Sequence, residues 1–135
     1  ISEDGKESVE VNRKDGLAIR LLKDKFDISI IVTSSESNPV VKKRCEKLSI
    51  ECLQNLEDKA VTISKYIKDH KIDPSDYWYT GNDINDLVAI NQSNFSLCPS
   101  DSNPDIYLKV DYVLKTKGGN GIFQEIFSLV SRIET

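Results

Sequence analysis

Histidine, methionine and long apolar runs are what this sequence most conspicuously lacks. His70 is the only histidine in 135 residues, and methionine is absent. With one histidine, a zinc site or a Ser-His-Asp triad has almost nothing from which to be built. The lack of a signal peptide and of any apolar run near 18 residues predicts that the chain neither spans nor crosses a membrane. The net charge of −4 argues against binding to nucleic acid or to an anionic membrane.

Cysteine is also scarce, and its spacing is uninformative for metal binding. Cys45, Cys52 and Cys98 lie far apart in the sequence and match no metal-ligand pattern. We therefore expect free thiols in a reducing cytoplasm rather than a disulfide. The length suits one domain with a single core between two layers. Because the chain starts at Ile1 without methionine, we expect residues 1–135 to be a single domain truncated at its N-terminus.

Segments typical of strands alternate with segments typical of helices, and the links between them are short. The expected strands are 9–12, 28–33, 49–53, 76–81, 95–98 and 110–114. The expected helices begin at Asp15, Asn38, Asp58, Ile84, Ser102 and Ile122. This order predicts an α/β fold, a three-layer sandwich with a mostly parallel, Rossmann-like sheet. The strand at 9–12 is expected to belong to a small N-terminal β-hairpin.

Two residues next to expected helix starts are candidates for anion binding, because ligands collect at the carboxyl ends of parallel strands. Ser34 follows a predicted buried strand, so its hydroxyl and nearby backbone N–H groups are able to face an anion. The alternative is a simple turn that starts a helix. Lys59 occupies the first turn of a predicted helix, where the macrodipole disfavours a cation unless a phosphate lies beside it. A solvated lysine that tolerates a small penalty is the alternative.

The segment GNDIND, residues 81–86, places three oxygen-bearing side chains at another strand end. Gly81 permits a tight turn, and Asn82, Asp83 and Asp86 offer the hard oxygen ligands that Mg²⁺ prefers. Asn82 and Asp86 would lie on the same side if the loop continues into a helix. A capped turn accounts for one of these residues but not for all three. Both interpretations stay open on the residues alone.

The order of these pieces resembles the haloacid dehalogenase-like phosphohydrolases, in particular their small, capless subfamily. That subfamily includes 3-deoxy-octulosonate 8-phosphate phosphatase, sialic acid 9-phosphate phosphatases and the C-terminal domain of acylneuraminate cytidylyltransferases. Matching segments cover nearly the whole chain in the family's order. They are GKESVEVNRKDGLAIRLLK, TSSESNPVVKKRCEKLSIEC, DKAVTI, YTGNDINDL, PSDSNPDI and KVDYVLKTKGGNGIFQEI. Ser35 and Glu36 stand where the octulosonate branch usually has Gly-Arg, which favours the nonulosonate, sialic-acid-type branch.

The resemblance implies roles for individual residues. Ser34 would bind the transferring phosphoryl group, and Lys59 would neutralise its charge together with Mg²⁺. The metal would be held, directly or through water, by Asn82, Asp83 and Asp86.

For the substrate, the resemblance implies a small phosphorylated sugar acid. The resemblance implies that Glu36, Arg44 and Lys47 recognise the sugar acid. The alternative interpretation is that these three residues form a solvated helix face. Gly118 and Gly119 match a C-terminal loop that closes over a site, often that of a neighbouring subunit in this homotetrameric family.

Two departures from the family pattern weigh on function. The Asp-x-Asp-Gly motif, which carries the family's nucleophile and general acid/base, does not occur in these 135 residues, so the chain alone is expected to be inactive. Asn82 stands where many active members have Asp. The leading hypothesis is a Mg²⁺-dependent phosphatase, or its phosphatase-like part, acting on a nonulosonate 9-phosphate or 3-deoxy-octulosonate 8-phosphate. The alternative is a non-catalytic oligomerisation domain fused behind an acylneuraminate cytidylyltransferase, which makes CMP-activated sialic acid.

Overall fold

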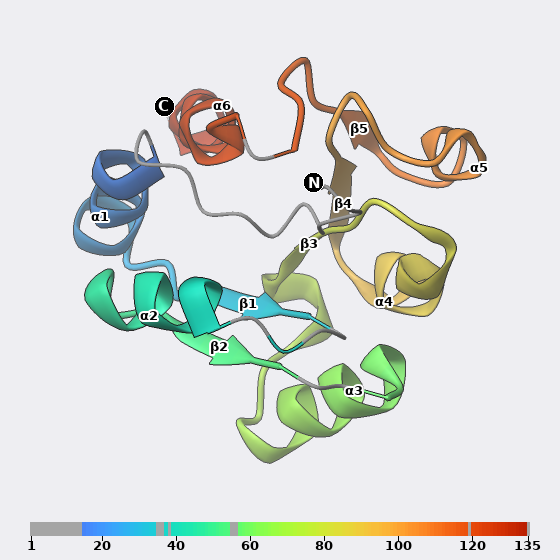
Figure 1. The fold of residues 1–135 in the computed structure, drawn as a ribbon. Coiled ribbons are helices and arrows are strands. Elements are labelled where there is room, and N and C mark those ends of the chain that lie inside the picture. The colour runs from blue at the N-terminus through green and yellow to red at the C-terminus, as the bar shows by residue number, and fades with distance from the viewer. Residues whose placement is uncertain (1–14, 35–36, 38, 55–56, 119, 135) are drawn as a thin grey trace. The chain divides into compact units, whose positions relative to one another are not determined.

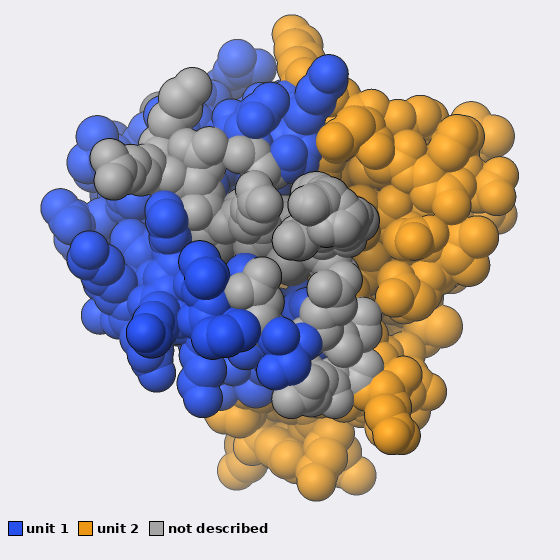
Figure 2. Space-filling view, viewed as in Figure 1, with its two compact units in different colours: residues 1–55, 116–135 blue, residues 56–115 orange. Residues whose placement is uncertain are grey.

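The structure is a computed structural model that describes residues 15–34, 37, 39–54, 57–118 and 120–134. The chain forms two compact units, residues 1–55 with 116–135, and residues 56–115 (Figure 2). Helices and strands alternate along the described chain (Figure 1). In order they are α1 (Asp15–Phe26), β1 (Ile31–Thr33), α2 (Pro39–Lys47), β2 (Glu51–Leu53), α3 (Lys59–Asp69), the 3₁₀ turn η1 (Pro74–Asp76), β3 (Trp78–Thr80), the 3₁₀ turn η2 (Ile84–Asp86), α4 (Leu87–Gln92), β4 (Phe95–Cys98), α5 (Pro104–Tyr107), β5 (Tyr112–Val113) and α6 (Ile122–Glu134).

The first unit is built on a parallel strand pair. β1 and β2 pair in register, with Val32 opposite Cys52. The core of this unit is apolar. Its buried members are Ile19, Val41, Cys45 and Ile50, and Ile30, Val32, Leu48, Cys52 and Phe123 pack against them. Burial of this surface is the main stabilising contribution to the unit.

Helices α1 and α6 of the same unit pack against each other. The rings of Phe26 and Phe127 lie with their centroids 5.8 Å apart. Asp15, at the start of α1, is fully buried and accepts a hydrogen bond of 3.0 Å from the backbone N–H of Phe123. That N–H belongs to the first turn of α6 and has no partner inside the helix, so the carboxylate satisfies it and complements the helix dipole. Gly121 has φ 91°, a left-handed conformation that glycine tolerates, directly before α6.

The second unit holds a three-stranded parallel sheet in the order β3-β4-β5. Tyr79 of β3 pairs with Ser96 of β4, and Leu97 of β4 pairs with Tyr112 of β5. The core on this sheet consists of Ile90, Cys98 and Ile106, with Tyr79, Leu87, Tyr107 and Val110 packed against it. Parallel pairing brings the carboxyl ends of these strands to the same edge, where the turn at 81–86 begins.

The structure confirms the predicted α/β fold with parallel sheets. The expected strand at 95–98 coincides with β4, and Asp58 caps α3 as its sequence position indicates. The apolar pattern of the sequence also predicts that Leu17 and Ile133 face the core, and this prediction is wrong, because each residue is 64% exposed. Two helical positions turn the chain by about 200°, so Leu17 faces away from the buried Ile19.

Other predictions are not tested. The β-hairpin lies outside the described residues, and the single-domain organisation and third layer stay predictions. Within the described part of the chain, no helix is long and apolar enough to cross a membrane.

Candidate functional site

Asp86 is the centre of a polar network at the end of β3. Its side chain is buried, with 1% of the residue exposed. One carboxylate oxygen, Oδ1, accepts hydrogen bonds from the Lys59 ammonium at 3.2 Å and from the Tyr79 hydroxyl at 2.5 Å. The other, Oδ2, accepts from the backbone N–H groups of Asn82 at 3.0 Å and Asp83 at 3.2 Å. Four donors therefore converge on one carboxylate, which has about four lone-pair positions to offer.

Lys59 is a buried cation at an unfavourable helical position. It is the first residue of α3, and only 8% of it is exposed. A positive charge there opposes the helix dipole, and burial removes water from the ammonium. The ion pair with Asp86 compensates for both costs. The anion that the structure places beside Lys59 is the Asp86 carboxylate, and the phosphate expected there from the sequence stays a prediction.

Asp58 fixes the point at which Lys59 enters the helix. Its side chain accepts a hydrogen bond of 3.2 Å from the backbone N–H of Val61, as a helix N-cap does. The cap satisfies one of the unpaired N–H groups of the first turn. It also fixes Lys59 as the first residue of α3.

Gly81 lets the turn close on Asp86. An added Cβ at Gly81 would lie 2.6 Å from Cβ of Asp86 and 2.7 Å from its Cγ. Such distances are far below van der Waals contact, so any side chain at position 81 would displace the buried carboxylate. Glycine is required here for close approach.

Asp83 and Asn82 form the outer part of the turn. Asp83 is exposed, and its Oδ1 accepts hydrogen bonds from the N–H of Ile84 at 2.7 Å and from Nδ2 of Asn103 at 3.1 Å. The N–H of Asn103 in turn donates to the Asn82 carbonyl at 3.0 Å. The loop after β4 therefore braces the turn after β3. The N-terminal capping box formed by Asp83 and Asp86 adds to this bracing.

The donor set of this turn fits a hard divalent cation such as Mg²⁺. Magnesium in proteins is commonly bound through one or two carboxylates, with water and substrate phosphate completing its octahedron. The exposed Asp83 carboxylate and the half-buried Asn82 carboxamide supply oxygens of that kind. Asp86 is placed to hold the turn in shape, because four donors already engage its oxygens. Within the described residues, no group of three or more His, Cys, Asp or Glu side chains is arranged to bind a metal.

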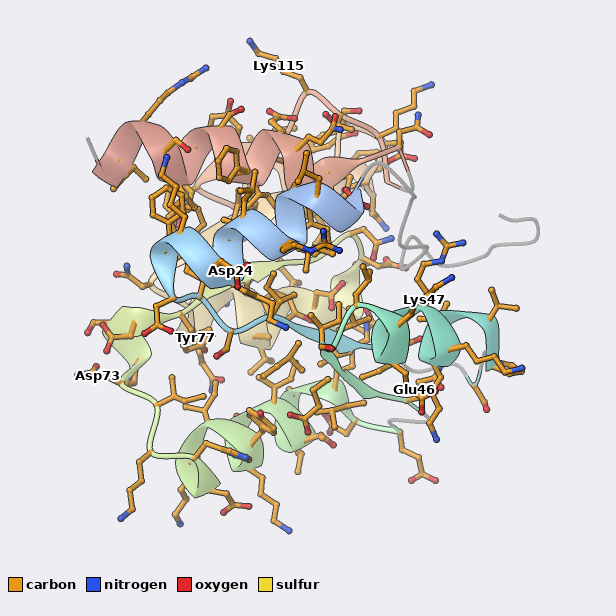
Figure 3. All side chains as sticks on the ribbon, turned by 90° about the vertical axis from the view of Figure 1, so that its left-hand side faces the viewer. Asp24, Glu46, Lys47, Asp73, Tyr77 and Lys115 are labelled. Atoms are coloured by element: carbon orange, nitrogen blue, oxygen red, sulfur yellow. The ribbon has the colours of Figure 1, made fainter. Side chains whose placement is uncertain are left out.

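The remaining predicted site residues belong to the other unit or lie outside the described residues. Ser34 is buried after β1, and its N–H donates to the Leu53 carbonyl at 2.9 Å, continuing the β1–β2 pairing. Arg44 and Lys47 lie in the last turn of α2, where the helix dipole favours cations. Lys47 is labelled in Figure 3. Gly118 lies in the loop before α6. Glu36 and Gly119 are outside the described residues.

The structure thus brings together four of the predicted residues, Lys59, Asn82, Asp83 and Asp86, in the unit of residues 56–115. Sequence reasoning missed Tyr79 and Asn103. Tyr79 stands two residues before Gly81, so the strand preceding the turn carried a signal. Asn103 precedes Pro104 and caps α5 by accepting from the N–H of Asp105, a pattern readable from the sequence.

Comparisons with known proteins identify the family of this chain. A family model described as haloacid dehalogenase-like hydrolase matches residues 4–126. The 3-deoxy-D-manno-octulosonate 8-phosphate phosphatase KdsC of Escherichia coli K12 is 28% identical over 127 residues, which are 93% of this chain and 67% of that protein. The chain therefore spans about two thirds of this relative's length.

Two solved structures are similar along most of the chain. The cobalt-bound deoxy-D-mannose-octulosonate 8-phosphate phosphatase of Haemophilus influenzae has a TM-score of 0.83 at 27% identity, covering 91% of this chain and 72% of that one. The 3-deoxy-D-manno-octulosonate 8-phosphate phosphatase of Moraxella catarrhalis, in complex with magnesium ion, phosphate ion and KDO, has a TM-score of 0.84 at 26% identity. That match covers 97% of this chain and 75% of the other.

Proposed function

Because the chain belongs to the haloacid dehalogenase-like hydrolases, we propose that it takes part in the hydrolysis of a sugar-acid phosphate monoester. The first candidate substrate is 3-deoxy-D-manno-octulosonate 8-phosphate, the compound named for the relatives in Escherichia coli and Moraxella catarrhalis. In this reaction, water adds its oxygen to phosphorus and the P–O bond to the sugar breaks. The products are inorganic phosphate and the free sugar acid. A nonulosonate 9-phosphate is the second candidate, favoured by Ser35 and Glu36.

The observation that carries the proposal is the buried Lys59 paired with Asp86, the carboxylate that also accepts the N–H groups of Asn82 and Asp83. A lysine ammonium held by Asp86 at the start of α3 is a fixed positive charge that needs no reorganisation when a phosphoryl group arrives. Phosphoryl transfer depends mainly on positioning and on neutralising charge at the phosphoryl oxygens. A fixed cation next to an oxygen-lined turn provides both.

The other residues receive roles that remain predictions. Mg²⁺, held by Asn82 and Asp83 with Asp86 behind them, would polarise a phosphoryl oxygen when bound. Ser34 is proposed to bind the phosphoryl group. Glu36, Arg44 and Lys47 are proposed to recognise the sugar acid, with Arg44 and Lys47 facing its carboxylate. The loop that contains Gly118 and Gly119 is proposed to close over a site of a neighbouring subunit in a homotetramer. A cytoplasmic location of the protein is also proposed.

Phosphate release tests the proposal. The protein is assayed at the length that its gene encodes, with Mg²⁺ and with each of the two candidate phosphates. We expect turnover of at least one, and we expect Lys59→Gln to lower kcat about 100-fold, as loss of a charge-stabilising group does. Lys65→Gln is the matched control, because Lys65 is exposed on the same helix. A folded protein that releases no phosphate from either compound would refute the proposal.

A second candidate function is a non-catalytic assembly domain of an acylneuraminate cytidylyltransferase. It is favoured by the absence of Asp-x-Asp from these 135 residues and by Asn82 in the place of an aspartate. The presence of the Lys59–Asp86 ion pair argues against a non-catalytic role. Sedimentation of the full-length protein separates the two: a stable tetramer that hydrolyses neither phosphate would support the assembly domain.

A further inference from the structure

Two donors from different elements share one oxygen of Asp86. Lys59 reaches Oδ1 from α3 at 3.2 Å, and Tyr79 reaches it from β3 at 2.5 Å. The shorter contact is the one to Tyr79. From this geometry we infer that Tyr79 is a positioning residue that fixes the Asp86 carboxylate, and through it the Lys59 ammonium and the turn at 82–83. The inference rests on the proposed function, in which Lys59 neutralises the phosphoryl group.

Tyr79 is suited to act as the rigid end of this chain of contacts. Its backbone is paired with Ser96 in the β3–β4 ladder, and its ring packs against the core formed by Ile90, Cys98 and Ile106. A tyrosine has only two side-chain torsions, so a packed ring places its hydroxyl with little freedom. Lysine, by contrast, has a flexible four-carbon stem and a charge that any acceptor satisfies. Lys59 therefore takes its position from Asp86, and Asp86 takes its own from Tyr79.

The other carboxylate oxygen extends the effect to the turn. Oδ2 accepts the N–H groups of Asn82 and Asp83, the two residues proposed to hold the metal. Any rotation of the Asp86 carboxylate moves both oxygens together. Removing the Tyr79 hydroxyl would thus loosen the Lys59 ammonium and the backbone of the turn at once. Such loosening should lower kcat, because a displaced cation stabilises the transition state less, while leaving KM nearly unchanged.

Tyr79→Phe tests the inference, and Tyr77→Phe is its matched control. Tyr77 lies two residues earlier and undergoes the same chemical change. Among the described residues, its buried hydroxyl has no hydrogen-bond partner. For Tyr79→Phe we expect kcat to fall about tenfold, the usual effect of losing a hydrogen bond to a charged group, with KM within about twofold. For Tyr77→Phe we expect both constants within about twofold of the original protein.

A second readout does not depend on activity. Amide hydrogen exchange, measured by NMR, reports on the N–H groups of Asn82 and Asp83. We expect about tenfold faster exchange at both in Tyr79→Phe and no change there in Tyr77→Phe. If the original protein hydrolyses neither candidate phosphate, the proposed function fails. The exchange result still tests whether Tyr79 fixes the Asp86 carboxylate. Unchanged exchange at Asn82 and Asp83, or an unchanged kcat in an active protein, would overturn the role of Tyr79.

Discussion

Replacing Asp86 by asparagine is the perturbation whose effect follows most directly from the structure. All four contacts to its carboxylate come from donors: Lys59, Tyr79 and the N–H groups of Asn82 and Asp83. Asparagine offers one acceptor oxygen and an NH₂ group that itself donates. Whichever way the carboxamide turns, two of the donors face another donor. Lys59 also keeps its buried charge without a counter-ion.

The expected loss of stability is large. Breaking a buried ion pair by removing one partner typically costs about 3–5 kcal/mol, because the remaining charge is left uncompensated. Urea unfolding followed by circular dichroism at neutral pH measures this loss as the difference in the free energy of unfolding. The matched control is Asp83→Asn, which makes the same chemical change three residues away. Asp83 is exposed and caps η2, and asparagine caps as well as aspartate, so we expect a change within about 0.5 kcal/mol.

The comparison between the two variants is decisive for the network around Asp86. Equal free energies of unfolding for Asp86→Asn and Asp83→Asn would show that the buried carboxylate of Asp86 does not stabilise the turn more than the exposed one of Asp83. A loss above 3 kcal/mol confined to Asp86→Asn would support the stabilising role of Asp86. The same pair of variants separates stability from function, since Asp83→Asn is expected to weaken Mg²⁺-dependent turnover without unfolding the protein.

Two further predictions concern the turn at Gly81 and the buried thiol of Cys45. Gly81→Ala places a methyl carbon 2.6 Å from Cβ of Asp86, so we expect about 1–3 kcal/mol of destabilisation in a thermal melt; a melting temperature equal to that of the original protein would contradict the required close approach. Burial, with smaller contributions from Cys52, raises the pKa of the Cys45 thiol from 9.0 to about 12. Because the unfolded thiol loses its proton first, stability should fall as pH rises from about 9 toward 12, and fall less in Cys45→Ala. Identical pH dependence in the two proteins would speak against this burial effect.

Some of the site could be predicted from sequence because local rules determine it. Asp58 as the N-cap of α3 and Gly81 as the start of a tight turn follow from residue type and position. The spacing of Asn82 and Asp86 predicted that they lie on the same side, and the structure shows a hydrogen bond from the Asn82 N–H to Asp86 Oδ2. The location of Lys59 at a helix start predicted a phosphate beside it, and that stays a prediction, whereas its ion pair with Asp86 was not foreseen.

The rest depended on contacts that spacing does not encode. The role of Asp86 in holding the metal, directly or through water, stays a prediction. Its contacts to Lys59 of α3 and Tyr79 of β3 join separate elements and could not be read from spacing. The position of Tyr79 just before the turn was readable from the sequence, but its hydrogen bond to Asp86 became visible only in the structure. Leu17 was assigned inward from hydrophobicity alone, whereas the helical period directs it to solvent.

Phosphate binding by the full-length protein tests the central claim most directly, namely that Lys59, held by Asp86, is a fixed cation for a phosphoryl group. Isothermal titration calorimetry with inorganic phosphate in the presence of Mg²⁺ measures the affinity, and Lys65→Gln serves as the control. We predict that Lys59→Gln weakens phosphate binding about tenfold or more while Lys65→Gln does not. Equal phosphate affinity in the original protein and in Lys59→Gln would contradict the account.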